Sequence, residues 1–166
     1  MSAQVSRTVI DSLEFARTGQ TLRGSLAVSD LTRLQDSLYD ALGLVEFAVQ
    51  GGHDSRHRPT LRLDVSGVLH LKCQRCLGQL DHPLRLANTL LLASAAGGLD
   101  DDEEYESIEA SPELDVGALV EDEIILGLPY SPRHAEGDCP ADRHDPAGDT
   151  GRSPFAKLAT LRRNLN

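Results

Sequence analysis

The sequence lacks tryptophan and contains only three cysteines, and both shortages restrict what the chain can be. With three phenylalanines and three tyrosines among 166 residues, the core must consist mainly of aliphatic side chains. Three cysteines cannot all pair within one chain, and residues 1–20 contain no apolar stretch of signal-peptide length, so we expect a reduced, cytoplasmic protein. No run approaches the roughly 18 apolar residues of a membrane-spanning helix, which argues against a membrane partner.

Basic residues are also scarce, with 16 against 26 acidic residues and a formal net charge of −10. This balance argues against a protein that covers a phosphate backbone, and it favours partners with basic surfaces. Between Asp100 and Glu123 there are twelve acidic residues and no lysine or arginine. Because a block of like charges repels itself, we expect residues 99–109 to form a mobile acidic loop.

Hydrophobic periodicity predicts an α+β fold with a mainly antiparallel, partly barrel-like sheet of four or more strands and two or three packed helices. Alternating apolar residues predict strands over residues 22–28, 44–50, 61–73 and 80–92. Helical spacing predicts one helix over residues 31–42, with Leu31, Leu34, Leu38 and Leu42 on its apolar face. It predicts a second over residues 116–126, capped by Asp115.

These patterns divide the chain into three parts: an α+β core (residues 1–132), a His/Cys loop with a polar linker (133–152) and a basic amphipathic C-terminal segment (153–166). In the last part Pro154 begins a short predicted helix with an apolar stripe of Phe155, Leu158, Leu161 and Leu165. So short a helix needs a surface to pack on. That surface is either the protein's own core or a partner.

The two strands over residues 61–73 and 80–92 place Cys73 and Cys76 at or near the bend of a hairpin. A second pair, His134 and Cys139, follows the second predicted helix on a proline-rich loop. Zinc is commonly bound by four nitrogen and sulfur ligands drawn from two such local pairs. The sequence therefore indicates a structural zinc site formed by Cys73, Cys76, His134 and Cys139. The alternative is that the thiols are small buried apolar groups.

Other chemistry has weaker support in the sequence. A dithiol redox site normally opens a helix in a βαβ unit, whereas this Cys-x-x-Cys joins two strands. His82 is near enough to the thiols to substitute as a ligand, but it alternates with apolar residues. The carboxylates Glu121, Asp122 and Glu123 point in different directions on a helix and indicate a solvated face. We find no phosphate loop, nucleophile elbow or catalytic triad, and so predict no small-molecule substrate.

The chain contains in order Cys73-Gln74-Arg75-Cys76, a run from Asp115 to Pro129 with VEDEIILGLP at residues 120–129, Pro132-x-His134, Cys139 and Pro154-Phe155-Ala156-x-Leu158-x-x-Leu161. Together these motifs resemble the YceD family, the large ribosomal RNA subunit accumulation proteins. The resemblance extends from about Leu61 to Arg163. Family members often carry more cysteines after the helix, whereas this chain keeps only His134 and Cys139, which leaves ligands for one zinc ion at most.

The resemblance implies a non-enzymatic bacterial factor needed for the synthesis, processing or stability of large-subunit ribosomal RNA. Its expected partner is a basic protein or a ribonucleoprotein of ribosome assembly, with weak rRNA contact through Lys157, Arg162 and Arg163. The alternative function is a dithiol- or metal-dependent enzyme using Cys73 and Cys76. A closed four-ligand site favours the first hypothesis, and an open coordination position favours the second.

Overall fold

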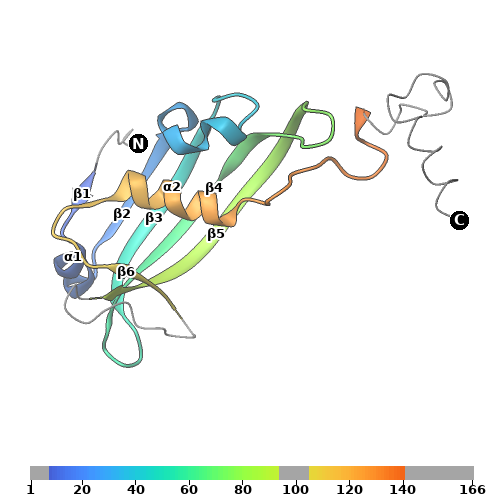
Figure 1. Ribbon diagram of the computed structural model, residues 1–166. Helices are drawn as coiled ribbons and strands as arrows, with labels where there is room; N and C mark the ends of the chain where they lie inside the picture. Colours follow the sequence, from blue (N-terminus) through green and yellow to red (C-terminus); the bar gives the residue numbers. More distant parts are fainter. Residues whose placement is uncertain (1–7, 94–104, 141–166) are drawn as a thin grey trace, which may run out of the picture.

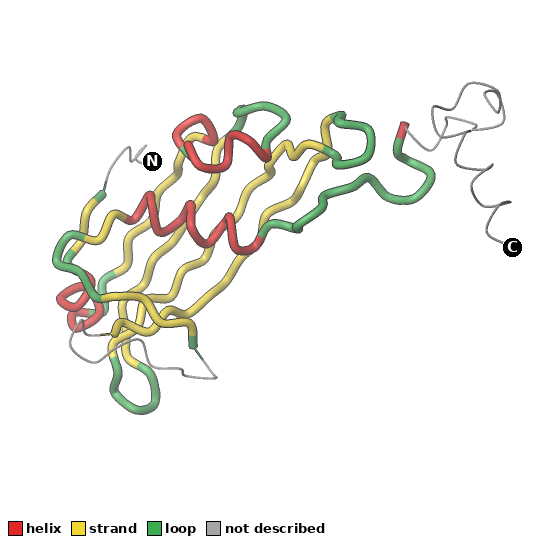
Figure 2. Tube along the Cα trace, in the orientation of Figure 1, coloured by secondary structure: helices red, strands yellow, loops and turns green. Residues whose placement is uncertain are grey.

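The computed structural model describes residues 8–93 and 105–140, which form a twisted sheet with helices packed on one face (Figures 1 and 2). The strands are β1 (Val9–Ile10), β2 (Thr21–Ala27), β3 (Leu44–His53), β4 (Pro59–Lys72), β5 (Gln79–Ala93), β6 (Glu106–Glu109) and β7 (Leu114–Asp115). The α-helices are α1 (Ser12–Thr18) and α2 (Val116–Gly127), and η1 (Val28–Asp30) and η2 (Thr32–Ser37) are 3₁₀-helices.

The main sheet has five strands in the order β2-β3-β4-β5-β6, and β1 and β7 form a separate two-stranded sheet. All neighbours in the main sheet are antiparallel except β5 and β6, which run parallel. This arrangement confirms the α+β class and the mainly antiparallel sheet. The sheet is open in the described part of the chain, with β2 and β6 at its edges, so the expectation of a partly barrel-like sheet is wrong.

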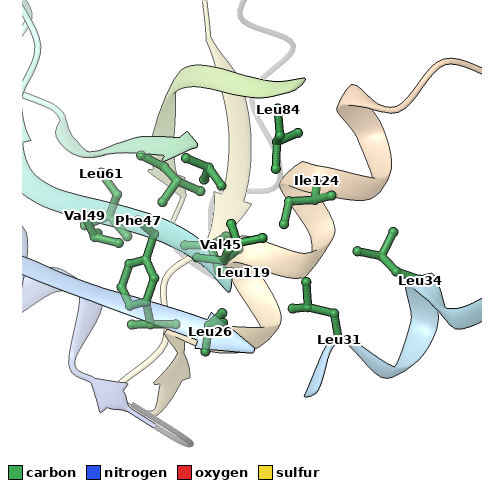
Figure 3. Close-up of a cluster of buried hydrophobic side chains, with 14 of the residues drawn as sticks. Leu26, Leu31, Leu34, Val45, Phe47, Val49, Leu61, Leu84, Leu119 and Ile124 are labelled. Atoms are coloured by element: carbon green, nitrogen blue, oxygen red, sulfur yellow. The ribbon is translucent and has the colours of Figure 1, made fainter. Parts of the chain in front are cut away.

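Alternation along the strands creates one buried and one exposed face of the sheet. On β3 the side chains of Val45, Phe47 and Val49 are buried, and the residues between them are exposed or half-buried. The same alternation continues on β4 through Leu61 and Leu63. These side chains meet those of α2 and η2 in one mainly aliphatic core (Figure 3). Among the described residues, no helix is both long and apolar enough to cross a membrane.

Helix α2 lies across the buried face of the sheet and brings the acidic region of the sequence onto the core (Figure 1). The side chain of Asp115 accepts hydrogen bonds from the N–H groups of Gly117 and Ala118, as the sequence predicts for an N-cap. Val116, Val120 and Ile124 are completely buried at helical spacing. Pro129 follows the end of the helix and prevents its continuation.

The expected α-helix over residues 31–42 is wrong: the chain forms η1 and η2, and the helical backbone ends at Ser37. Buried Leu31 and Leu34 are three residues apart, which suits the three residues per turn of a 3₁₀-helix. Leu38 then pairs with Leu71 in an antiparallel bridge, beside the end of β4. Pairing with the sheet overrides the local helical pattern.

Two further elements, α1 and β6, were not predicted from the sequence. Residues 12–18 form α1, although the sequence shows no clear periodicity there, because Asp11 caps the helix and Gly19 ends it with a φ of 63°. Glu106–Glu109 form β6 rather than part of a loop, since they pair with residues 90–93 of β5. The rest of the expected acidic loop that precedes Tyr105, and the C-terminal segment 153–166, lie outside the described residues.

Helix α1 lies close against the sheet at Gly51 of β3. A Cβ atom added to Gly51 would lie 2.2 Å from the carbonyl oxygen of Phe15, whereas one added to Gly52 would meet only the Thr60 hydroxyl at 3.7 Å. We predict that Gly51→Ala lowers the free energy of unfolding by roughly 1–3 kcal/mol or more, because backbone atoms must move. Gly52→Ala is the matched control and should be nearly neutral. Urea unfolding measures both, and equal losses would contradict this account.

Candidate metal centre

A tight turn between β4 and β5 holds the first two cysteines. The N–H of Cys73 donates to the carbonyl of Gly78 at 2.9 Å, and the N–H of Leu77 donates to the carbonyl of Cys73 at 2.9 Å. Leu77 adopts a φ of 59°, which lets the chain reverse within this short turn. The turn places Cys73 in the protein interior and Cys76 at its margin, as the hairpin prediction requires.

The chain segment after α2, here called the post-helix loop (residues 128–140), runs past this turn (Figure 2). The N–H of Gln74, between the two cysteines, donates to the carbonyl of Pro132 at 2.8 Å. This backbone hydrogen bond holds the post-helix loop against the hairpin. His134 and Cys139 follow on the same loop, and Cys139 is completely buried.

The two pairs meet in one cluster, here called the cysteine–histidine cluster. It consists of Cys73, Cys76, His134 and Cys139, whose ligand atoms all lie within 4.8 Å of one another. The Sγ atom of Cys76 lies 3.5 Å from Nδ1 of His134. Zinc–ligand bonds of about 2.3 Å to sulfur and 2.0–2.1 Å to nitrogen, at tetrahedral angles, require a sulfur–nitrogen separation of about 3.6 Å. The four side chains could therefore hold one zinc-sized ion with little movement.

The orientation of His134 is fixed from outside the cluster. Its Nε2 atom lies 2.7 Å from the carbonyl oxygen of Gln79, the first residue of β5. A carbonyl can only accept a hydrogen bond, so Nε2 carries the proton and Nδ1 faces Cys76. Metal-binding histidines usually donate their second N–H to such a partner. Sequence reasoning missed Gln79, because the interaction uses a backbone carbonyl that has no residue-type signature.

Hydrogen bonds to Cys73 and His134 shift their pKa values in opposite directions. The backbone N–H of Cys76 is the main cause that lowers the pKa of the Cys73 thiol to about 5, although burial raises it. Hydrogen bonding to Cys139 and to the Gln79 carbonyl raises the pKa of His134 to about 9. Both pKa shifts favour the charged form, a thiolate at Cys73 and an imidazolium at His134. A cation of higher charge can replace the imidazolium proton and balance the sulfur charge.

Cys76 behaves differently from Cys73. The N–H of Gly78 lowers its pKa, but burial and the neighbouring thiols of Cys73 and Cys139 outweigh that effect and raise the pKa. Like charges disfavour a second thiolate at such short range. Binding of a metal ion would remove this conflict by placing a positive charge among the sulfur atoms.

His82, the substitute ligand considered from the sequence, lies outside the cluster. His82 is on β5 opposite Leu69 and is not among the grouped ligand atoms of the described residues. His70 instead contacts Asp40, with Nδ1 and the carboxylate oxygen 2.8 Å apart. His144 lies outside the described residues.

The carboxylates of α2 do not form the wholly solvated face that the sequence indicates. Glu121 and Glu123 are both 7% exposed. Glu121 accepts hydrogen bonds from the backbone and side chain of Arg33, which also pairs with Asp122. Glu123 accepts one from Asn88, and burial, its largest influence, raises its pKa. Their partners come from distant segments, so the pattern within α2 could not reveal them.

Comparison with known proteins identifies a family and a similar protein. The family model described as "Large ribosomal RNA subunit accumulation protein YceD" matches residues 61–162. A Haemophilus influenzae protein named "Large ribosomal RNA subunit accumulation protein YceD" is 27% identical over 163 residues, covering 92% of this chain and 94% of that protein. No solved structure matches. The matched region contains the hairpin, α2 and the post-helix loop, which together build the cluster.

The thiol of Cys73 makes a testable contribution to stability in metal-free protein. Its pKa falls from 9.0 to about 5 on folding, so its stabilisation is fully present above pH 9 and is lost as the pH falls through about 5. We predict that the Tm advantage of the natural chain over Cys73→Ser, both measured with chelator, shrinks as the pH is lowered from neutral to about 5. A pH-independent difference would argue against a thiolate at Cys73.

Proposed function

The chain belongs to the YceD family, and we propose that it is a non-catalytic ribosome-biogenesis factor that supports the accumulation of large-subunit ribosomal RNA. The observation that carries this proposal is the family match over residues 61–162, which includes the hairpin, α2 and the post-helix loop. The similar protein from Haemophilus influenzae aligns over nearly its whole length, which supports a shared role.

The geometry of the cysteine–histidine cluster supports a structural role over catalysis. If the four nitrogen and sulfur atoms of the cluster bound one zinc ion, they would complete a tetrahedral coordination sphere and leave no position for water or substrate. Cys73, which the enzyme hypothesis would use with Cys76, is completely buried. A reactive thiol needs access as well as a low pKa. The alternative of a dithiol- or metal-dependent enzyme is therefore less well supported.

The charge of the chain supports a basic protein or a ribonucleoprotein as the partner. With a formal net charge of −10, the protein repels bare phosphate and attracts basic surfaces. Lys157, Arg162 and Arg163 are the residues through which we expect weak contact with rRNA, and they lie outside the described residues. Such contact would weaken steeply as salt concentration rises.

Depletion of the protein in cells tests the proposed function. We expect the amount of large-subunit rRNA to fall relative to small-subunit rRNA, because the family is defined by large-subunit rRNA accumulation. Quantitative RNA electrophoresis measures the ratio. Expression of the natural chain from a second copy should restore it and serves as the control. An unchanged ratio in fully depleted cells would contradict the proposal.

We further propose that the cysteine–histidine cluster binds one zinc ion, which fastens the post-helix loop to the hairpin. Because the ligands come from segments far apart in the chain, binding the ion would stabilise the folded state. The three sulfur ligands and one nitrogen ligand are typical of structural zinc sites.

Metal analysis and thermal unfolding test the zinc proposal. We expect one zinc ion per chain and a lower Tm after chelation. Cys76→Ser and Cys139→Ser should lower the Tm about equally, since they would share one ion, and chelator should then have little further effect. Gln74→Ala is the matched control on the same turn and should retain zinc. Purified protein that lacks bound metal and does not respond to added zinc would refute the proposal.

A further inference from the structure

The face of the main sheet opposite α2, here called the open face, carries a groove of about 730 Å³ (Figure 1). Residues that pair across neighbouring strands share a face, so the register shows which side chains lie there. Three rows of residues cross the open face from β2 through β3 and β4 to β5. They are Arg23, Ala48, Asp64 and Ala87 (the Arg23 row); Ser25, Glu46, Ser66 and Arg85 (the Arg85 row); and Ala27, Leu44, Val68 and Pro83 (the apolar row).

The apolar row is largely exposed. Leu44 lies beside Val68, because the next residues along, Val45 and Gly67, pair directly. Leu44 is 55% exposed and Val68 is 48% exposed. Contiguous exposed aliphatic side chains on a sheet mark a surface that gains from being covered.

The two charged rows repeat one pattern in opposite directions. The Arg23 row reads arginine, small, acidic, small, and the Arg85 row gives the same order when it is followed from β5 to β2. Among the described residues, Arg23, Arg85 and Glu46 form no ion pair or side-chain hydrogen bond, whereas Asp64 pairs with Arg62 at 3.2 Å. A partner of one charge sign would be repelled by half of this surface, so a matching surface must carry both signs in the same alternation.

A second copy of the open face supplies that alternation. Consider a two-fold axis that runs parallel to the strands between β3 and β4. It places β2 of one copy over β5 of the other, and β3 over β4, so each row lies over the same row of the second copy. The apolar row then covers itself, and every charged residue of the other two rows lies opposite a serine or an alanine. Large side chains thus meet small ones.

The same arrangement gives each arginine a partner. Arg23 would lie one strand spacing, about 4.8 Å sideways, from Asp64 of the second copy. Arg85 would lie equally close to Glu46 of the second copy. Two symmetric sets of such pairs would form, because the interface is isologous. The charges that have no partner within the chain therefore find one between copies.

The open face is also large enough. Four strands spaced by about 4.8 Å, and the ten residues of β3 at a rise of about 3.4 Å each, give roughly 19 by 34 Å, or about 650 Å². Specific interfaces bury roughly 600–1,000 Å² per partner. Face-to-face packing of two antiparallel sheets about 10 Å apart is the arrangement of a β-sandwich.

We propose that two copies of this chain pack through their open faces into a symmetric dimer with α2 of each copy on the outside. Because the axis is parallel to the strands, the Cys73–Cys76 turns of both copies lie at the same end. The dimer would thus present two cysteine–histidine clusters at one end, and a partner with two binding sites would gain avidity from it. This inference does not depend on the proposed role in rRNA accumulation.

Analytical ultracentrifugation of the full-length chain, with a reducing agent present, tests the dimer. We expect the mass of two chains for the natural sequence and half that mass for Val68→Asp, which places a carboxylate in the apolar row. Leu126→Asp is the matched control, since Leu126 is an exposed leucine of α2 on the other face, and it should remain dimeric. A natural chain that stays monomeric across the micromolar range would overturn the proposal.

Charge reversal tests the pairing itself. Arg85→Glu and Glu46→Arg should each be monomeric alone, because like charges then meet across the axis. An equimolar mixture of the two variants should regain the dimer mass, since every substituted residue faces the opposite charge on the other variant, and this recovery also shows that both are folded. Asp36→Arg, an exposed site on η2, is the control and should stay dimeric. A mixture that remains monomeric, or a dimer that survives every open-face substitution, would refute this interface.

Discussion

Antiparallel pairing of β4 with β5 is the constraint on which the rest of the structure depends. The two strands pair from Thr60 with Leu91 to Lys72 with Gln79, and they share one buried aliphatic face. A long ladder with one buried face has a fixed register, because a shift by one residue would expose every apolar side chain. The register in turn fixes the Cys73–Cys76 turn at one end and the pairing of β6 at the other.

The described helices all pack on one face of this sheet, and the opposite face stays open. A groove of about 730 Å³ crosses that open face and carries both charge signs, with Arg23 and Arg85 beside Glu46 and Asp64. On the other side, α2, β6 and the post-helix loop together contain seven acidic residues and one arginine. Attraction of basic molecules is therefore directed toward the helical side. The two faces of the sheet thus differ in charge, and the net charge of the chain alone does not show this difference.

Sequence patterns predicted the structure correctly where they were long and depended only on residues near one another in the chain. The strands around the hairpin and the Asp115 cap of α2 belong to this class. It failed where a distant segment decided the outcome: Leu38 leaves the helical pattern to pair with Leu71, and Glu121 is buried because Arg33 reaches it. The grouping of cysteines with His134 could be expected from residue type and spacing. The carbonyl of Gln79, which orients His134, could not.

The order of the cluster residues along the chain has a consequence for synthesis. The hairpin with Cys73 and Cys76 is made well before His134 and Cys139, and domains tend to fold from the N-terminal side during synthesis. Two thiols on a formed turn are therefore present before the ligands that would enclose them. During that interval they are open to oxidation or to a metal bound by two ligands only. Completion of the cluster requires that α2 has already been translated, so a closed cluster marks a chain whose core is fully made.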